Sequence, residues 1–286
     1  MYEILEKIVW LDQEPRITEF LVSAPEIARA HHAGQFVIVI PVEGGERIPL
    51  TIAAKDAKAG TISLVFQEVG KSTILLGRLK KGEKIPHVAG PLGKPTHIEK
   101  LGTVVCVGGG IGVAPIHPIA GAMMAAGNHV ISILGARSKD LMIYEERMRK
   151  ASHDVRITTD DGSYGRKGFV TDELKSIIEG GTRVDCVVVI GPPIMMKFVC
   201  KVTEPHKIPT WASLNTIMVD GTGMCGACRV TVGGETKFVC VDGPEFDGHQ
   251  VNFDELFARP RIYLPEEKLA SQRAYPDGFE IGGRSQ

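Results

Sequence analysis

The fold is decided by residues 101–127, which read LGTVVCVGGGIGVAPIHPIAGAMMAAG. Their order is a continuous apolar strand, a glycine cluster, and a helix of small and apolar residues. In this order, glycines let the backbone approach a phosphate group at a helix N-terminus. The glycines depart from the GxGxxG pattern, so they indicate a nucleotide site only if the surrounding chain supplies the rest of such a domain.

The chain that follows supplies that domain. Apolar strands are predicted within HVISILGARS (129–138), DVRITT (154–159) and VDCVVVIG (184–191), with helical or Gly-rich polar segments between them. Strands that alternate with helices predict a parallel sheet covered on both faces. The loops at the carboxyl ends of its strands are then expected to line a ligand crevice.

The chain before residue 96 has a different sequence pattern, in which short β-like runs are interrupted by Gly and Pro. The runs are EILEKIVWL (3–11), ITEFLVSA (17–24), GQFVIVIPV (34–42) and TISLVFQEVG (61–70). Closely spaced strands without long helices predict an antiparallel barrel or sandwich.

Two short motifs in this region suit a diphosphate. Arg47, followed by Pro49 and Thr51, offers a bidentate cation and a hydroxyl along one extended edge. Residues 70–73, GKST, add N–H groups and hydroxyls at the start of a helix predicted over residues 72–79. This is not a P-loop, because Val65 stands where that motif has its first glycine. Taken alone, either motif could be a surface turn.

Together with Gly90-Pro91-Leu92-Gly93, these motifs resemble the FAD-binding barrel of the ferredoxin-NADP reductase superfamily, and the glycine-rich stretch resembles its pyridine-nucleotide domain. The resemblance implies FAD contacts from Arg47, Pro49, Leu50, Thr51, Gly70, Lys71, Ser72 and Thr73. It implies NAD(H) contacts from Gly109, Gly110, Gly112, Arg137, Asp161, Gly162, Gly191 and Pro192. It favours NADH, although no acidic residue directly ends the second strand and Arg137 could accept a 2'-phosphate.

The last third of the chain carries a cysteine cluster. Residues 220–228, DGTGMCGAC, and the later Cys240 match the plant-type [2Fe-2S] spacing, with Asp220 in place of the first cysteine. A hairpin predicted over RVTV and KFVCV returns Cys240 beside Cys225 and Cys228. Structural zinc, or structural thiols on a turn, are the alternatives. Asp220 either ligates iron or only stabilises the Asp-Gly turn. Core positions are expected for the other cysteines, Cys106, Cys186 and Cys200.

Up to about residue 250, the chain resembles the electron-transfer subunits of dihydroorotate dehydrogenase. With Asp220 in the motif, it is similar to the small (alpha) subunits of electron-bifurcating NADH-dependent reduced ferredoxin:NADP+ oxidoreductases. The resemblance implies an oxidoreductase subunit that exchanges hydride with NAD(H) at FAD and single electrons through a [2Fe-2S] cluster. The diaphorase subunit of a cytosolic hydrogenase, and a non-redox nucleotide-binding protein with structural zinc, are alternatives. No side chain is assigned as a catalytic acid or base.

The expected organisation is a β-barrel FAD domain (1–96), an α/β parallel-sheet NAD(H)-binding domain (97–212), a small [2Fe-2S] domain (213–250) and a C-terminal tail (251–286). The tail is charged and dotted with aromatics, so it is expected to lie against another subunit. The resemblance implies that this partner is a larger subunit with flavin and [4Fe-4S] centres. The two would form a heterodimer, and ferredoxin would be reached indirectly through the partner.

Composition excludes several classes of protein. A hydrophobic content of 43% with 23% charged residues is ordinary globular composition, and a net charge of -1 gives no electrostatic basis for binding nucleic acid or an anionic membrane. No apolar run reaches the roughly 18 residues that span a bilayer, and the start MYEILEKIVW has no signal-peptide pattern. A cytoplasmic location is therefore expected.

Overall fold

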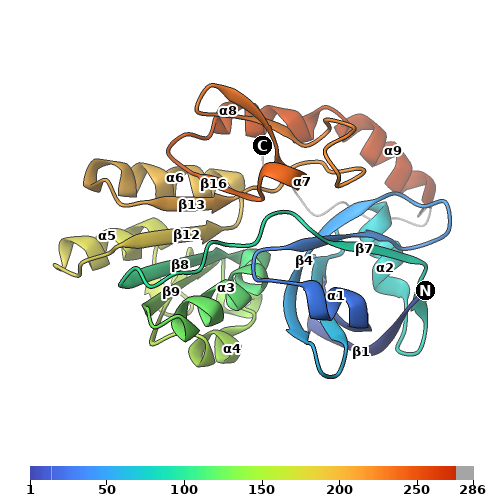
Figure 1. Ribbon diagram of the computed structural model, residues 1–286, viewed down its shortest axis with the longest axis horizontal. Coiled ribbons are helices and arrows are strands. Elements are labelled where there is room, and N and C mark those ends of the chain that lie inside the picture. The colour runs from blue at the N-terminus through green and yellow to red at the C-terminus, as the bar shows by residue number, and fades with distance from the viewer. Residues whose placement is uncertain (14, 275–286) are drawn as a thin grey trace.

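A computed structural model describes residues 1–13 and 15–274 of the chain. It contains two seven-stranded sheets and a separate two-stranded hairpin among these residues. Figure 1 shows a barrel on the right, an α/β layer on the left, and the C-terminal segments above both. None of the helices within the described residues combines the length and the apolar character needed to cross a membrane.

The N-terminal sheet is a near-closed antiparallel barrel, as the short strand pattern predicts. Its strands follow the order β6-β1-β2-β5-β4-β3-β7, and every pair is antiparallel. Alternate residues such as Phe20, Ile62 and Leu64 are fully buried inside it. The elements are β1 (Tyr2–Leu11), β2 (Ile17–Ser23), α1 (Pro25–Ala30), β3 (Phe36–Ile40), β4 (Ile48–Asp56), β5 (Thr61–Gln67), α2 (Lys71–Arg78), β6 (Lys84–Ile85) and β7 (His87–Leu92).

The second sheet is parallel over its first six strands, in the order β11-β10-β9-β8-β12-β13, and ends with antiparallel β16. The strands are β8 (Thr103–Gly109), β9 (His129–Ala136), β10 (Asp154–Thr159), β11 (Arg166–Lys167), β12 (Cys186–Ile190), β13 (Thr210–Ser213) and β16 (Glu245–Asp247). The prediction of a parallel sheet is confirmed for all four sequence-predicted strands.

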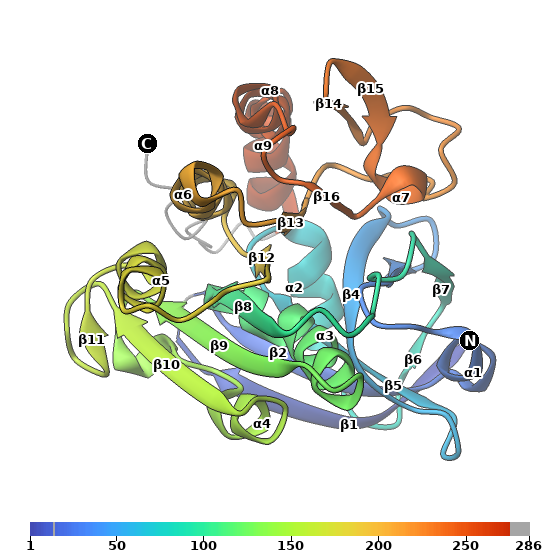
Figure 2. The ribbon, with the colours of Figure 1, turned by 60° about the vertical axis from the view of Figure 1, so that its left-hand side comes forward.

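Helices cover both faces of this sheet, because its central strands carry buried apolar side chains on both sides. Val105 and Val107 of β8 pack towards α5 and α6, while Val104 and Cys106 pack towards α3 and α4. Figure 2 shows these two helix layers on opposite sides of the strands. The helices are α3 (Val113–Ala125), α4 (Glu145–Lys150), α5 (Val170–Glu179) and α6 (Pro193–Thr203), and the short 3-10 turns are η1 (Gly110–Gly112), η2 (Lys139–Leu141), η3 (Glu204–His206) and η4 (Arg259–Arg261).

The C-terminal segments begin with the predicted hairpin, β14 (Arg229–Val232) and β15 (Glu235–Phe238), which turns at Gly233 and Gly234. The prediction that the second strand continues through Cys240 is wrong, because Cys240 lies in the short helix α7 (Val239–Asp242). The Asp242 carboxylate accepts a hydrogen bond of 2.7 Å from the Phe238 N–H, which holds the chain in this helical turn. Cys240 nevertheless returns to Cys228, as the hairpin prediction requires.

Part of the predicted tail packs on its own chain. It forms α8 (Phe253–Ala258) and α9 (Leu264–Ala274), and α9 lies beside α2 of the barrel. Phe253 and Leu256 are buried in the main apolar cluster, and Arg259 donates a hydrogen bond of 2.8 Å to the carbonyl of Ala227 in the cysteine loop. Residues 275–286 of the tail lie outside the described residues, and docking of the tail on a partner stays a prediction.

The connection between the two sheets, residues 93–102, contains the expected boundary at 96/97 and is tied to β16. The Thr96 hydroxyl donates a hydrogen bond of 2.6 Å to Glu245. Burial raises the pKa of the Glu245 carboxyl from 4.5 to about 7, because desolvation disfavours the carboxylate, while the Thr96 hydrogen bond acts in the opposite direction.

Glu245→Gln is expected to stabilise the chain at alkaline pH. The folded chain holds the Glu245 proton up to pH about 7, whereas the unfolded chain releases it near 4.5. Stability contributed by the protonated group is therefore lost as the pH rises through this window. The variant should gain up to about 3 kcal/mol over the parent at pH about 8, and this gain should shrink towards pH about 4. Denaturant unfolding across this range measures it, and a pH-independent difference would contradict the assignment.

Candidate functional site

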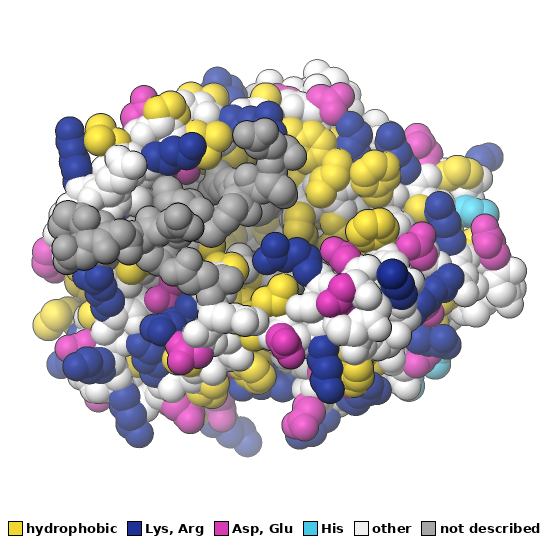
Figure 3. Space-filling model, turned by 180° about the vertical axis from the view of Figure 1, so that it is seen from behind, with side chains coloured by type: hydrophobic (Ala, Val, Ile, Leu, Met, Phe, Trp, Pro, Cys, Tyr) yellow, Lys and Arg dark blue, Asp and Glu magenta, His cyan; other side chains and the backbone are white. Residues whose placement is uncertain are grey.

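A cavity of about 1060 Å³ lies between the barrel and the parallel sheet. The carboxyl ends of β8, β9, β10, β12 and β13 open into it, as expected for a parallel sheet. Figure 3 shows hydrophobic side chains gathered near the middle of one face of the molecule. Among the residues predicted to bind cofactors, those in the cavity lining are Pro49, Leu50, Thr51, Thr73, Gly109, Gly110, Gly112, Arg137, Gly191 and Pro192.

The barrel side of the cavity is formed by the end of β4. Thr51 pairs with Phe36 of β3, and both residues line the cavity beside Pro49 and Leu50. This edge is mostly apolar and carries the Thr51 hydroxyl, which suits a flat aromatic ring system with polar edges. The exposed Arg47 is the one member of the motif that does not line the cavity.

The GKST motif lies at the start of α2, where Thr73 accepts hydrogen bonds of 3.0 and 3.1 Å from the N–H groups of Val69 and Gly70. Only Thr73 of the four lines the cavity. Ser72 donates a hydrogen bond to the Glu46 carboxylate, and Lys71 Nζ lies 3.7 Å from Glu46 Oε1. A carboxylate is thus already held by the groups predicted to hold a phosphate, which fits the chemistry of an oxyanion site.

The nucleotide side is built where β8 runs through η1 into α3. Gly110 has φ +55, a conformation that glycine adopts readily. A Cβ on Gly112 would lie 2.3 Å from the Ile190 carbonyl oxygen, so the backbones of η1 and β12 approach more closely than a side chain allows. This close approach leaves the N-terminus of α3 open towards the cavity, where an anionic group is stabilised by the helix.

The acidic loop after β10 differs in detail from the sequence expectation. Asp160 lines the cavity near Arg137, whereas Asp161 and Gly162 do not. Burial raises the pKa of the Asp160 carboxyl, and Arg137 opposes this shift. Asp161 instead accepts hydrogen bonds of 2.9 and 2.7 Å from the N–H and hydroxyl of Ser163, and these bonds lower its pKa. Asp160 could have been found from its place directly after a predicted parallel strand.

The candidate metal centre lies in the loop after β13. Cys228 and Cys240 are buried, and their sulfur atoms are 3.2 Å apart. Cys225 is exposed on the same loop. Asp220 accepts hydrogen bonds of 2.8 Å each from the N–H groups of Thr222 and Cys225. Within the part of the chain that the structure describes, no three His, Cys, Asp or Glu side chains are arranged to hold a metal ion.

The donor set nevertheless fits an iron-sulfur cluster. The thiols of Cys228 and Cys240 already touch, and Cys225 is on the same nine-residue loop as Cys228, DGTGMCGAC. Soft thiolates are the ligands that such clusters use. Burial, together with the neighbouring Cys228, raises the pKa of the Cys240 thiol to about 12. Bound metal would be needed to hold it as a thiolate at neutral pH. Cys106, Cys186 and Cys200 are confirmed as core residues.

A segment that carries no recognisable motif links the cavity to the metal loop. Ser213, Leu214, Asn215, Thr216 and Met218 all line the cavity. They begin at Ser213, the last residue of β13, and precede Asp220 by only a few residues. Their position at the carboxyl end of a parallel strand was the available signal, but β13 has only four residues and is not strongly apolar.

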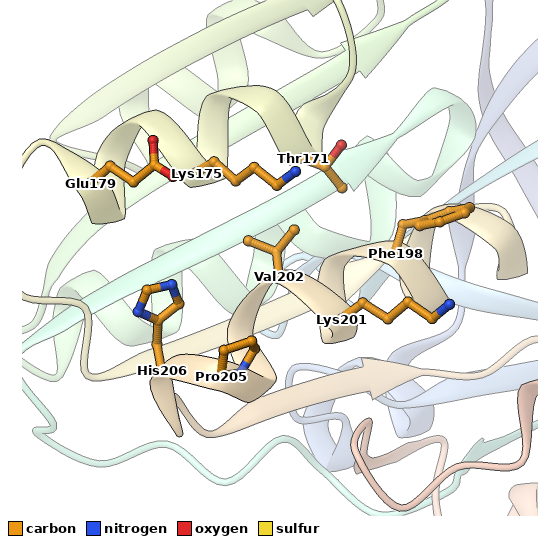
Figure 4. A pocket seen from close by; sticks show the side chains of 8 residues that line it. All are labelled: Thr171, Lys175, Glu179, Phe198, Lys201, Val202, Pro205 and His206. Carbon is orange, nitrogen blue, oxygen red and sulfur yellow. The ribbon is translucent and has the colours of Figure 1, made fainter.

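A second pocket of about 280 Å³ lies between α5 and α6. Figure 4 shows Lys175 and Thr171 on α5 and Lys201 and Phe198 on α6. Thr171 and Phe198 line both this pocket and the large cavity. No residue predicted from the sequence as a ligand lies in the lining of this smaller pocket.

Comparison with known proteins agrees with this arrangement. The family described as the iron-sulfur cluster binding domain of dihydroorotate dehydrogenase B matches residues 215–252, and the oxidoreductase NAD-binding domain matches residues 106–201. A Thermotoga maritima homolog of the dihydroorotate dehydrogenase B (NAD(+)) electron transfer subunit is 45% identical over 271 residues, covering 95% of this chain and 94% of the relative. The chain belongs to this family of electron-transfer subunits.

The chain is also similar to a further electron transfer subunit and to a solved structure. The electron transfer subunit from Streptococcus mutans is 32% identical over 249 residues, covering 84% of this chain and 94% of the relative. A solved structure reported for flavin-based electron bifurcation by NADH-dependent reduced ferredoxin-NADP oxidoreductase is 43% identical, with a TM-score of 0.90 over 96% of this chain and 97% of the other. As an electron-transfer subunit of this kind, the chain is part of an NAD(P)H-dependent oxidoreductase that uses FAD, NAD(H) and an iron-sulfur cluster.

Asp220→Ala is expected to lower cluster occupancy by more than about tenfold while FAD stays bound, because it removes a candidate ligand and two loop hydrogen bonds together. Asp220→Cys separates the two roles: a thiolate restores the four-cysteine pattern but not both hydrogen bonds. We expect Asp220→Cys to assemble a cluster with an altered EPR spectrum. An unchanged spectrum in Asp220→Ala would rule out Asp220 as a ligand.

Proposed function

We propose that this electron-transfer subunit works within a bifurcating NADH/ferredoxin:NADP+ oxidoreductase, exchanging hydride with NAD(H) at FAD and single electrons through a [2Fe-2S] cluster. The observation that carries the proposal is the single cavity shared by the barrel edge, the glycine motif and the segment before the metal loop. Bound FAD supplies the conversion between hydride transfer and single-electron transfer.

The residues of this chain have distinct tasks in the proposal. Pro49, Leu50 and Thr51 hold the flavin along β4, and Thr73 with the start of α2 closes over its phosphates. Gly110 and Gly112 bring the N-terminus of α3 to the nucleotide pyrophosphate, while the remaining predicted contacts, Arg47, Gly70, Lys71, Ser72, Asp161 and Gly162, act from outside the cavity lining seen here. The protein orients the two ring systems and excludes water, and no side chain transfers a proton.

The cavity and the cluster loop are close in the chain. Met218 lines the cavity, and two residues of extended chain to Asp220 span at most about 7 Å. The segment 213–218 therefore lines the proposed flavin site on one side and leads directly into the loop of the proposed cluster. This short connection supports single-electron exchange between the two centres.

NAD(H) is the proposed nucleotide. Asp160 and Arg137 both line the cavity, and Arg137 lowers the pKa that burial raises at Asp160. A carboxylate in that position offsets the charge of the arginine and disfavours the 2'-phosphate of NADP(H). The same carboxylate can accept a hydrogen bond from the ribose hydroxyl of NAD(H).

The proposed partner is a larger subunit with flavin and [4Fe-4S] centres, and ferredoxin is reached through it in the cytoplasm. Family members that serve dihydroorotate dehydrogenase make that enzyme the second candidate, and a hydrogenase diaphorase the third. Anaerobic purification of the native complex, with identification of its subunits and cofactors, tests the proposal. A dihydroorotate-oxidising partner would refute the bifurcating role, and a colourless, zinc-containing protein would refute the redox role.

A further inference from the structure

A polar cluster around the buried residues Glu19 and Tyr144 joins the barrel to the nucleotide domain, on the side away from the metal loop. It consists of Trp10 on β1, Glu19 on β2, Tyr144 directly before α4, and Arg147 within α4. We call these four residues the Glu19 cluster. Two of its members belong to the barrel and two to the nucleotide domain, so the contacts within it bridge the domains.

Both oxygens of the Glu19 carboxylate are engaged. Arg147 Nη1 donates a hydrogen bond of 2.8 Å to Glu19 Oε1, and Trp10 Nε1 donates one of 2.8 Å to Glu19 Oε2. The same Arg147 nitrogen donates to the Tyr144 hydroxyl at 2.6 Å. The guanidinium carbon lies 4.4 Å from the Tyr144 ring centre and 5.1 Å from that of Trp10, within cation–π range of both.

These contacts hold α4 in one position against the barrel. The Glu19 side chain is 3% exposed, so its charge has little access to water once Arg147 is removed. Tyr144 has φ +63, a left-handed conformation that a bulky residue adopts only when its surroundings hold it there. Directed hydrogen bonds, stacking and a strained backbone together leave α4 few alternative positions against the barrel.

The cluster lies immediately behind the cavity. Leu11 follows Trp10, Ile17 precedes Glu19 by two residues, and Leu141 precedes Tyr144 by three, and all three line the cavity. A second bridge runs alongside, where His117 Nδ1 on α3 lies 3.2 Å from the Ala53 carbonyl of β4. The His117 ring meets the Tyr144 ring edge-on at 5.7 Å. The helix that begins at the glycine motif is thus held by the same set of contacts.

We infer that the Glu19 cluster is a positioning device that sets the angle between the two domains and thereby the alignment of the nicotinamide with the flavin. This inference rests on the proposed function, since it requires hydride exchange in the cavity. Hydride transfer depends steeply on alignment, whereas binding of FAD alone uses barrel residues and does not require the nucleotide domain to be aligned.

The test is Arg147→Lys in the full chain loaded with FAD and its cluster. Lysine keeps the positive charge but loses the planar, multiply donating guanidinium and its stacking. At saturating NADH, flavin reduction in an anaerobic stopped-flow experiment should slow by about tenfold to a hundredfold, with FAD affinity and KM for NADH changed by less than about threefold. Arg149→Lys is the matched control, because Arg149 lies on the same helix and pairs with Glu145 at the surface. In this variant, the flavin should be reduced at the parental rate.

Glu19→Gln provides the second variant, since it keeps the shape of the side chain and removes its charge. It should slow reduction similarly, and the double variant Glu19→Gln/Arg147→Lys should be no slower than the worse single variant, because both remove one interaction. Parental rates in both single variants, or FAD affinity falling in step with the rate, would overturn the inference. Failure of NADH to reduce the parent protein would instead refute the proposed function.

Discussion

Cys225→Ser should yield a folded protein that binds FAD and contains essentially no iron. Cys225 is exposed, and its backbone N–H donates a hydrogen bond of 2.8 Å to Asp220, which the serine variant keeps. The substitution therefore removes no packing. Serine oxygen is a harder and poorer ligand for iron than thiolate, so a three-thiolate set reduced to two should not retain the cluster. Iron analysis, visible absorption and EPR of anaerobically prepared protein measure the outcome.

The matched control for Cys225→Ser is Cys200→Ala. Cys200 is 5% exposed within α6, outside the cysteine loop, and burial raises its thiol pKa to about 12. This variant should cost some stability and keep its iron. Full iron content in Cys225→Ser would remove that residue from the ligand set, and zinc in place of iron in the parent would favour the structural alternative.

The sequence predicted the framework of the molecule because that framework depends on local patterns. The continuous valine runs around Cys106 and Cys186 can only be buried strands, and the glycine cluster after the first of them fixes where the helix begins. The hairpin at Gly233 and Gly234 was predictable for the same reason, since its turn chemistry is contained in a few adjacent residues.

Average composition was a poor guide to structure in two segments, the one around Cys240 and the C-terminal tail. Cys240 was expected in a strand because KFVCV is rich in β-branched and aromatic residues, but the segment folds into α7, where the Phe238 N–H donates a hydrogen bond to Asp242. The tail is charged on average, yet two of its residues, Phe253 and Leu256, bury α8 in the apolar cluster, while docking of the tail on a partner stays a prediction. The Phe238–Asp242 bond is local and the burial of α8 is a tertiary contact, and each outweighs the average composition of its segment.

The parts of the site that sequence reasoning missed have no motif of their own. Residues 213–218 line the cavity because of where β13 ends, and the Glu19 cluster assembles residues more than a hundred positions apart, as the separation of 128 between Glu19 and Arg147 shows. Trp10 and Tyr144 look like ordinary core aromatics in the sequence. Only the packing of the barrel against α4 shows that they share one carboxylate.

Gly112→Ala is expected to weaken NADH binding by about tenfold to a hundredfold, because the chain must move by a substantial fraction of an ångström to accept one methyl group. The added Cβ would lie 2.3 Å from the Ile190 oxygen and 2.8 Å from the Ile190 carbon, and both are backbone atoms of β12 that cannot rotate away. The backbone of Gly112 itself has φ -60, so alanine is not excluded by conformation. The effect is therefore one of contact, and titration of NADH against the FAD-loaded protein measures it.

Gly121→Ala on the same helix separates this contact from the general effect of alanine in a helix. Its Cβ would meet nothing closer than 3.9 Å, at Ala151, so this variant should bind NADH like the parent and gain about 0.5–1 kcal/mol of stability from helix propensity. Gly112→Ala adds the same methyl group, but it is expected to lower the stability instead of raising it, since overpacking costs about 1–3 kcal/mol. If both variants bound NADH equally well, the N-terminus of α3 would not be the nucleotide site. If only Gly112→Ala lost binding, the close approach of η1 to β12 would be what opens that site to a phosphate.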